Sequence, residues 1–258
     1  MSDARLRARS TSEIVDAAFS LYRQQPLVYM LAAAAGNVPY LVGTLLVQNG
    51  SASANLATSG IGVVLMLASI VIYGLMSAAV IHVGSRAYLG ETPDLGESIR
   101  AILPRTLTIL GASIERTILY SIGFFVLVVP FFWVFARYFA VIPIITLEGS
   151  KMSKAFKRSA QLSDGRKGHI LGTLMLVWVI YFVAAIGLSA MMGLVLGGSQ
   201  VITTLLSTIV TIVIYPVIAL TEMVLYYDAR IRSEGFDLER MAQELGIDGA
   251  PDGSPRAG

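Results

Sequence analysis

Hydrolytic enzymes and metal sites commonly use histidine, cysteine or serine side chains, so these residue types are the first candidates for chemistry in this chain. His82 and His169 are the only histidines, and there is no cysteine. No second histidine stands at ligand spacing from either one, so a zinc site is not expected. A nucleophilic serine needs a histidine base, and no nucleophile-elbow pattern surrounds any serine. The sequence therefore predicts no catalytic residues, no metal and no cofactor, and an enzyme is not expected.

Arg137 is the residue whose position most suggests a binding site. It lies deep in an apolar run, residues 106–147. A charge at mid-bilayer costs about 2.5–3.5 kcal/mol on insertion scales, so Arg137 needs a partner or a wet cavity. Glu148 and Glu222 are the candidate partners. One interpretation is a site for an anion or a lipid headgroup between helices. The other, which we prefer from sequence alone, is a structural ion pair or an arginine that reaches out to water.

A second set of candidate residues follows the last apolar run and alternates in sign: Asp228, Arg230, Arg232, Glu234 and Asp237. The pattern predicts a juxtamembrane seam, in which ion pairs fix the last long helix to short helices beside it. A docking surface for a cytoplasmic partner is the alternative. Exposed ion pairs of this kind are common and individually weak. We therefore prefer the seam.

The elements that must position these residues are membrane helices. Of 258 residues, 55% are hydrophobic and only 14% are charged, whereas soluble domains are about 25% charged. A crossing needs about 20 apolar residues. The sequence predicts an all-α integral membrane protein with one domain, residues 1–248, a disordered tail, 249–258, and six transmembrane helices at about 27–47, 61–83, 107–129, 131–147, 170–196 and 201–225.

The third and fourth predicted spans come from one apolar run that is too long for a single crossing. Pro130 lies near its middle, and proline tends to break or kink a helix. We therefore expect two spans joined at Pro130. The second, 131–147, is short, so a re-entrant hairpin is the alternative.

Charge placement predicts the orientation. The basic residues other than Arg137 fall into four clusters, at residues 5–23, 86–116, 151–167 and 230–256. The intervening loops, at residues 48–60, at the turn around Pro130 and at residues 197–200, carry no charge. Cytoplasmic loops carry the excess of lysine and arginine. Only an even number of crossings between residues 116 and 151 keeps all four clusters on one side. Six spans with both termini in the cytoplasm satisfy this rule.

Short amphipathic, basic stretches precede the pairs of spans. They begin at Ser10, Thr92 and Ser150, and Ser10 forms a capping box with Glu13. Helices of this kind lie in the headgroup plane. The order suggests three copies of one unit, an interfacial helix followed by a transmembrane hairpin. A last amphipathic helix is expected at residues 236–245.

Two blocks of residues carry a resemblance to a known family. The first begins Arg137-Tyr-Phe-Ala, continues through Pro143 and Glu148, and ends Ala-Phe-Lys-Arg-Ser159. The second begins at Tyr226 and reads Tyr-Tyr-Asp-Ala-Arg-Ile-Arg-Ser-Glu. Together they resemble a bacterial family of membrane proteins, labelled the membrane domain of glycerophosphoryl diester phosphodiesterases, and the resemblance extends over nearly the whole chain.

The resemblance implies a membrane part that stands without its enzyme. In members that carry the phosphodiesterase, the enzyme is a separate soluble barrel that uses histidines with acidic metal ligands. No residues remain in this sequence to build that barrel, so the activity is not expected here. The family implies a bacterial protein, and the spans then predict a multi-pass protein of the inner, or plasma, membrane.

Two classes of function remain open. The first is a non-catalytic membrane protein that organises or binds lipid, or that scaffolds a cytoplasmic or membrane protein partner. The second is a transporter or channel for a small anionic or lipid-related solute, which would need polar side chains along one route. The first is preferred, because the charges lie mainly at the expected interfaces. A net charge of +2 gives no reason to expect nucleic acid as a partner.

Overall fold

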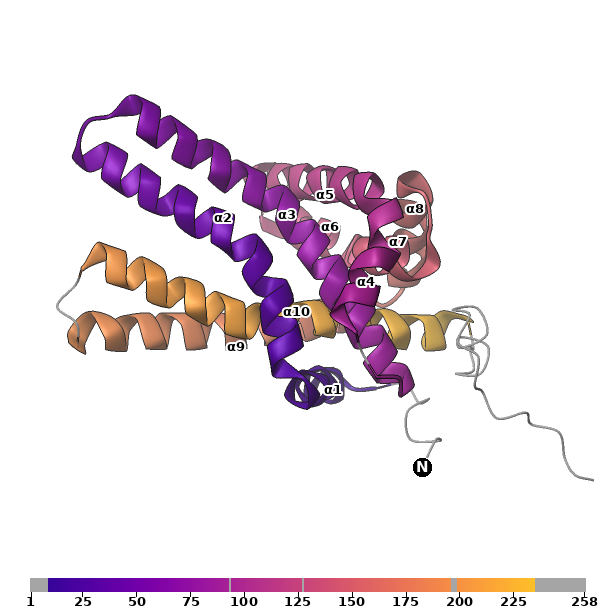
Figure 1. Cartoon of the computed structure of the whole chain (residues 1–258). Coiled ribbons are helices and arrows are strands. Elements are labelled where there is room, and N and C mark those ends of the chain that lie inside the picture. Colours follow the sequence, from indigo (N-terminus) through magenta and orange to yellow (C-terminus); the bar gives the residue numbers. More distant parts are fainter. Residues whose placement is uncertain (1–8, 93, 127, 196–198, 235–258) are drawn as a thin grey trace, which may run out of the picture.

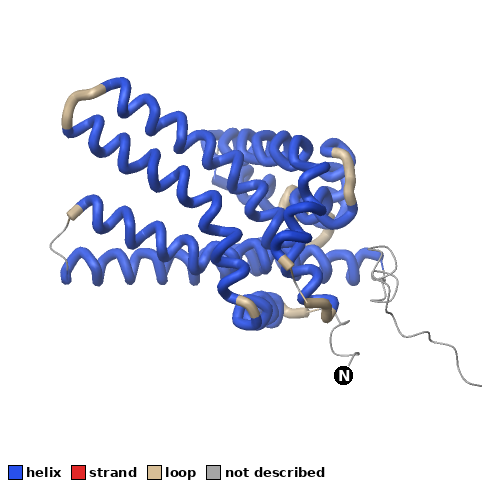
Figure 2. The backbone as a smooth tube through the Cα atoms, viewed as in Figure 1, coloured by secondary structure: helices blue, strands red, loops and turns tan. Residues whose placement is uncertain are grey.

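The computed structural model describes residues 9–92, 94–126, 128–195 and 199–234, and every regular element within them is helical (Figures 1 and 2). Three predictions lie outside this described part of the chain: the seam residue Asp237, the amphipathic helix at residues 236–245 and the tail at 249–258. The helices are α1 (Thr11–Gln24), α2 (Pro26–Ala52), α3 (Leu56–Leu89), α4 (Leu95–Ile102), the 3-10 helix η2 (Leu103–Arg105), α5 (Thr106–Val126), α6 (Val128–Arg137), α7 (Val141–Glu148), α8 (Met152–Ser163), α9 (Lys167–Val195) and α10 (Gln200–Glu234).

Two long hairpins, α2–α3 and α9–α10, extend in the same general direction from the part of the molecule that holds the short helices (Figure 1). Glycines allow α2 and α3 to approach closely, because a Cβ added at Gly43 would lie 2.6 Å from the carbonyl oxygen of Gly62. The two hairpins are joined near their far ends, where Gln48 Nε2 donates to Thr204 Oγ1 at 2.8 Å. Helix α10 therefore contacts both α9 and α2.

The long helices have the length and composition of membrane spans. Five stretches qualify: Pro26–Ala52, Leu56–Leu89, Pro130–Glu148, Lys167–Leu188 and Gln200–Glu234. Large apolar side chains are exposed along the helices, including Leu56 at 88% and Phe125 at 85%. Burial of that surface requires lipid. The predicted all-α membrane fold is confirmed, and the number of crossings and their orientation stay predictions.

The predicted spans 107–129 and 131–147 correspond to three helices. Helix α5 covers the first, but it is not one of the five stretches that qualify as spans. Helices α5 and α6 pack against each other, and Pro130 lies within the first turn of α6, where a proline is tolerated. The return is broken again after Arg137, so α6 and α7 are separate helices rather than one continuous span. Pro143 lies in the first turn of α7 and has no N–H to bond the carbonyl oxygen of Phe139, so it disfavours a continuous helix across this second break. The break is stabilised by a neighbouring helix.

The short helices differ from the prediction in what they cover. Helix α1 begins with the predicted capping box, in which Ser10 Oγ accepts from Glu13 N–H and Ser10 N–H donates to Glu13. Its apolar face, including Ile14 and Ala18, is fully buried and packs against α10 and α9. Ala155 on α8 is likewise fully buried. These apolar faces are therefore covered by protein, whereas their amphipathic pattern predicted a position in the headgroup plane.

Candidate functional site

A break between α6 and α7 sets the geometry of the site. Ser159 on α8 is fully buried beside it. Its hydroxyl donates to the carbonyl oxygen of Arg137 at 2.9 Å and accepts from the backbone N–H of Ala140 at 3.2 Å. Backbone groups freed by a helix break within a membrane protein must find partners inside the protein. Ser159 supplies one on each side, so Arg137 is held at the last position of α6.

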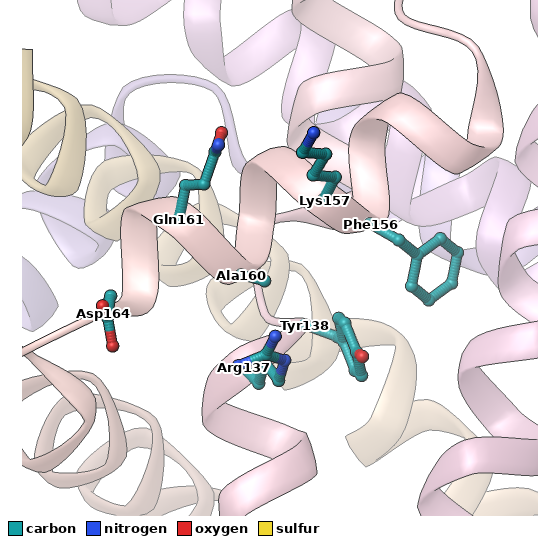
Figure 3. A pocket seen from close by; sticks show the side chains of 7 residues that line it. All are labelled: Arg137, Tyr138, Phe156, Lys157, Ala160, Gln161 and Asp164. Carbon is teal, nitrogen blue, oxygen red and sulfur yellow. The ribbon is translucent and has the colours of Figure 1, made fainter.

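A cavity of about 390 Å3 lies between this end of α6 and the adjacent face of α8. In Figure 3, Arg137 and Tyr138 lie on one side of α8 near the small side chain of Ala160. Tyr138 and Phe156 form its aromatic wall, with ring centroids 5.1 Å apart. The residues that line the cavity are Arg137, Tyr138, Phe156, Lys157, Ala160, Gln161 and Asp164.

The charges around the cavity leave an excess of positive charge. Arg137 and Lys157 line it, and Lys167 lies at its edge, where its Nζ bonds to Asp164 Oδ1 at 3.2 Å. The hydrogen bond from Lys167, and its charge, hold the pKa of Asp164 below its usual value. Asp164 is therefore ionised and already paired. Two cations and one carboxylate line the cavity, and that carboxylate is already paired with Lys167, so the site favours an anion.

Arg137 itself forms no ion pair with any residue that the structure describes. Its guanidinium lies over the ring of Trp133, 4.8 Å from the centroid, and 5.8 Å from that of Tyr138. The predicted pairing with Glu148 or Glu222 is therefore absent, since both carboxylates are taken by other arginines. Trp133 is 48% exposed, and tryptophan is typical of the membrane interface. The ion-pair interpretation therefore falls, and an unpaired arginine beside an open cavity agrees both with a binding site and with an arginine that reaches out to water.

Glu148 belongs to a ring of polar contacts that joins α7, α8 and α10. It accepts from Arg158 Nε at 2.6 Å and from the Tyr226 hydroxyl at 2.7 Å. Arg158 also bonds to Glu234 at 2.8 Å, and Glu234 bonds to Arg230 at 3.0 Å. Burial disfavours the charge of Arg158, but the hydrogen bond and charge of Glu148 hold its pKa above the ordinary value. The ring fixes α8, which lines the cavity, to α10.

Asp228 is the centre of the predicted seam. Its carboxylate, which is 2% exposed, bonds to Arg232 at 2.7 Å and lies 3.3 Å from His169 Nε2. It also accepts from the backbone N–H of Arg9 at 2.7 Å. Arg232 in turn donates to the carbonyl oxygen of Arg9 at 2.6 Å. These contacts join the end of α10 to α9 and to the segment before α1, which is the geometry of a seam rather than of a free docking surface.

Glu222 comes before Asp228 in α10, within the predicted span 201–225, and pairs with a residue that was not predicted as its partner. Its Oε2 is 3.7 Å from Nη1 of Arg116 on α5. The guanidinium also lies 5.7 Å from the ring centroid of Tyr120. Within the described residues, both of these ion-pair atoms and the Tyr120 hydroxyl are buried without a hydrogen-bond partner. This is a second polar cluster, separate from the cavity.

Comparison with known families locates these residues. Residues 109–229 match the family model described as the membrane domain of glycerophosphoryl diester phosphodiesterase. The predicted family resemblance is confirmed over these residues, and its predicted extent over nearly the whole chain stays a prediction. The matched segment contains Arg137, Ser159 and Glu148, together with the Arg116–Glu222 pair. No curated protein and no solved structure matches the chain.

Several residues of the site were not recognised from sequence. Trp133 and Lys157 carry no pattern that places them beside Arg137, because Pro143 signals a helix break but not which helix packs across it. A charge within an apolar run indicates that Arg116 needs a partner, but from sequence Arg116 is counted only as part of the basic cluster at residues 86–116. Within the described part of the chain, no three histidine, aspartate or glutamate side chains come together to hold a metal ion.

Proposed function

We propose that this protein is a non-catalytic membrane module that binds the headgroup of an anionic phospholipid in the cavity beside Arg137. The observation that carries the proposal is the state of Arg137, which forms no ion pair with a described residue and faces a cavity of about 390 Å3. A phosphate oxygen in the cavity would supply the missing partner. Arginine binds phosphate with two parallel hydrogen bonds, which makes it well suited to that role.

The surroundings of the cavity support a lipid rather than a soluble anion. Trp133 is exposed next to Arg137, and an exposed tryptophan is typical of the depth where aromatic side chains meet headgroups. Lys157 and Lys167 add charge, and a basic residue near an anionic membrane surface contributes about 1 kcal/mol. Since the four basic clusters predict that this face is cytoplasmic, the proposed lipid belongs to the cytoplasmic leaflet of a bacterial inner membrane.

The contacts at the end of α10 support a scaffold role for the rest of this face. The Glu148 ring and the Asp228 seam hold α1, α8, α9 and α10 together around the cavity. A bound headgroup would therefore contact a braced set of helices, and a cytoplasmic or membrane protein partner could recognise that set. The carboxylate of Asp228 is occupied by contacts within the seam, so it is not free to bind such a partner.

Native mass spectrometry of the protein released with its lipids tests the proposal. Wild type should retain a defined anionic lipid, and Arg137→Ala should lose it. Lys154→Ala is the matched control, because Lys154 is an exposed residue of the same helix α8 that does not line the cavity. Equal lipid retention by wild type, Arg137→Ala and Lys154→Ala would reject a lipid site at Arg137.

A transporter for a small anion is the second candidate, and the Arg116–Glu222 pair favours it. Ionisable residues inside a membrane commonly mark a substrate or ion pathway. The pair has buried polar atoms without hydrogen-bond partners, which ordered water or a passing solute would satisfy. Anion flux into liposomes that contain wild type, but not into liposomes that contain Glu222→Gln, would favour transport. Absence of flux with wild type would leave the lipid-binding module.

A further inference from the structure

A second polar cavity, of about 150 Å3, lies between the end of α3, η2 and the end of α7. It is separate from the cavity beside Arg137. The side chains that can take part in binding are His82, Ser85, Arg86, Glu91, Arg105 and Thr146. A cavity of this size accepts a molecule as large as benzene, so a tetrahedral oxyanion fits within it.

Thr146 gives the first indication of a ligand. It is fully buried, and its hydroxyl has no hydrogen-bond partner among the described residues. Other helical threonines donate to the carbonyl four residues earlier, as Thr173 does to His169 at 2.9 Å and Thr221 to Val217 at 2.8 Å. Thr146 lies in α7 and does not use this local bond. A buried hydroxyl left without a partner is costly unless something else accepts from it.

Two arginines give the second indication. The Nη1 of Arg105 donates to the carbonyl oxygen of Thr146, which places the guanidinium beside that residue. No carboxylate of the described chain forms an ion pair with Arg105. Arg86 also lines the cavity and is paired, to Glu91 at 2.7 Å and to Glu97 at 3.0 Å. Arg105 is thus the cation that remains for an incoming anion.

His82 and Glu91 set the balance of the site. His82 Nδ1 is 3.0 Å from Ser98 Oγ, so the other ring nitrogen is the one left for a ligand. Glu91 lines the cavity and is an anion itself, and it opposes an incoming anion by like-charge repulsion. The cavity therefore holds donors on several sides and one internal competitor. Such an arrangement would bind an anion less tightly than a cavity that holds donors alone.

We propose that this cavity binds a phosphate-sized tetrahedral oxyanion, held by the guanidinium of Arg105 and the hydroxyl of Thr146. The oxyanion is either free inorganic phosphate or the phosphomonoester group of a lipid such as phosphatidic acid. Arg105 supplies charge-assisted hydrogen bonds, which suit the planar guanidinium and the tetrahedral anion. Glu91 lowers the affinity, because it shares the cavity with the ligand.

Equilibrium binding of radiolabelled inorganic phosphate to the protein in phosphatidylcholine nanodiscs tests the site. Arg105→Gln should weaken binding about tenfold or more, as expected for hydrogen bonds to a charged group. The matched control is Arg100→Gln, which removes the same charge from an exposed position on α4 and should leave binding unchanged. Glu91→Gln should tighten binding.

Thr146→Val separates a binding role from a structural one. The change keeps the shape of the side chain and removes a buried hydroxyl without a partner, so the melting temperature should not fall. Phosphate binding should nevertheless weaken, by about threefold or more. If Thr146→Val and Arg105→Gln bind phosphate as wild type does, the site is rejected. Arg137→Ala should have no effect here, so this result does not depend on the proposed lipid site.

Nanodiscs that contain phosphatidic acid distinguish the two sources. Competition by phosphatidic acid for radiolabelled phosphate, lost in Arg105→Gln, assigns the site to a lipid phosphomonoester. Phosphate binding that phosphatidic acid does not affect assigns it to the free ion. If wild type binds no phosphate and retains no phosphatidic acid in an Arg105-dependent manner, the proposal is wrong.

Discussion

The hydroxyl of Ser159 bonds to the carbonyl oxygen of Arg137 at 2.9 Å, from a different helix. The same hydroxyl accepts from the N–H of Ala140 at 3.2 Å, so one buried side chain satisfies both ends of the break between α6 and α7. Without the break, α6 would continue past Arg137 as a regular helix, and the position of Arg137 relative to α8 would change. The cavity therefore depends on a residue that does not line it.

Ser159→Ala should destabilise the protein by about 1–3 kcal/mol, because two backbone groups would be left buried without a partner. It should also weaken retention of anionic lipid, since Arg137 would lose its fixed position. Thermal unfolding in detergent, followed by native mass spectrometry, measures both effects. Ser153→Ala, at an exposed position of α8, is the control and should change neither. A stable Ser159→Ala protein with normal lipid retention would argue against this role.

Glu148 and Arg158 should be energetically coupled. They bond at 2.6 Å, and both are only partly shielded, with exposures of 17% and 30%. We therefore expect a coupling free energy of about 1 kcal/mol, below that of a fully buried pair. A double-mutant cycle with Glu148→Gln and Arg158→Gln, measured by chemical denaturation, gives this value. Additive effects of the two substitutions would show that the ring does not act as a unit.

The Arg116–Glu222 pair should behave as a buried ion pair. Arg116→Met alone leaves Glu222 buried without its cation, and should cost about 3–5 kcal/mol. Arg116→Met combined with Glu222→Met should recover much of that loss, because apolar side chains replace both charges. Thermal unfolding of the single and double variants in one detergent makes the comparison. A double variant less stable than either single variant would indicate that the charges serve another purpose in the fold.

Orientation is predicted by the basic clusters and can be measured directly. Reporter fusions after Gln48 and Gly198 should lie outside the cytoplasm, and fusions after Gly90, Gly165 and Gly258 inside it. The paired reporters are alkaline phosphatase, active outside, and a fluorescent protein, active inside. A cytoplasmic Gln48 would overturn the six-span topology.

The long helices could be located well from sequence, because an uncharged apolar run of about 20 residues is typical of a membrane helix. The predicted span 61–83 lies within α3, and the capping box at Ser10 marked the start of α1 correctly. The amphipathic pattern of α1 correctly indicated one apolar face. What covers that face could not be predicted, since lipid and protein are equally apolar partners and periodicity does not distinguish them.

Arg137 marks the limit of prediction from sequence. A single charge in an apolar run identified it as a residue that must have a partner or reach water. Its surroundings depend on a helix break, which Pro143 signals, and on the packing of α8 across that break, which has no local signal. The family resemblance marked Glu148 and Ser159 without giving their roles. The structure supplies those roles, as an ion-pair partner of Arg158 and as the support of the break.

The fluorescence of Trp133 offers the most direct test of the central claim, that the cavity beside Arg137 holds an anionic headgroup. Trp178→Phe leaves Trp133 as the single tryptophan, in contact with the Arg137 guanidinium at 4.8 Å. Titration with an anionic phospholipid should give a saturable change in emission, and phosphatidylcholine should give none. Adding Arg137→Gln should abolish the saturable change. An identical, non-saturating response to both lipids, with or without Arg137, would contradict the account.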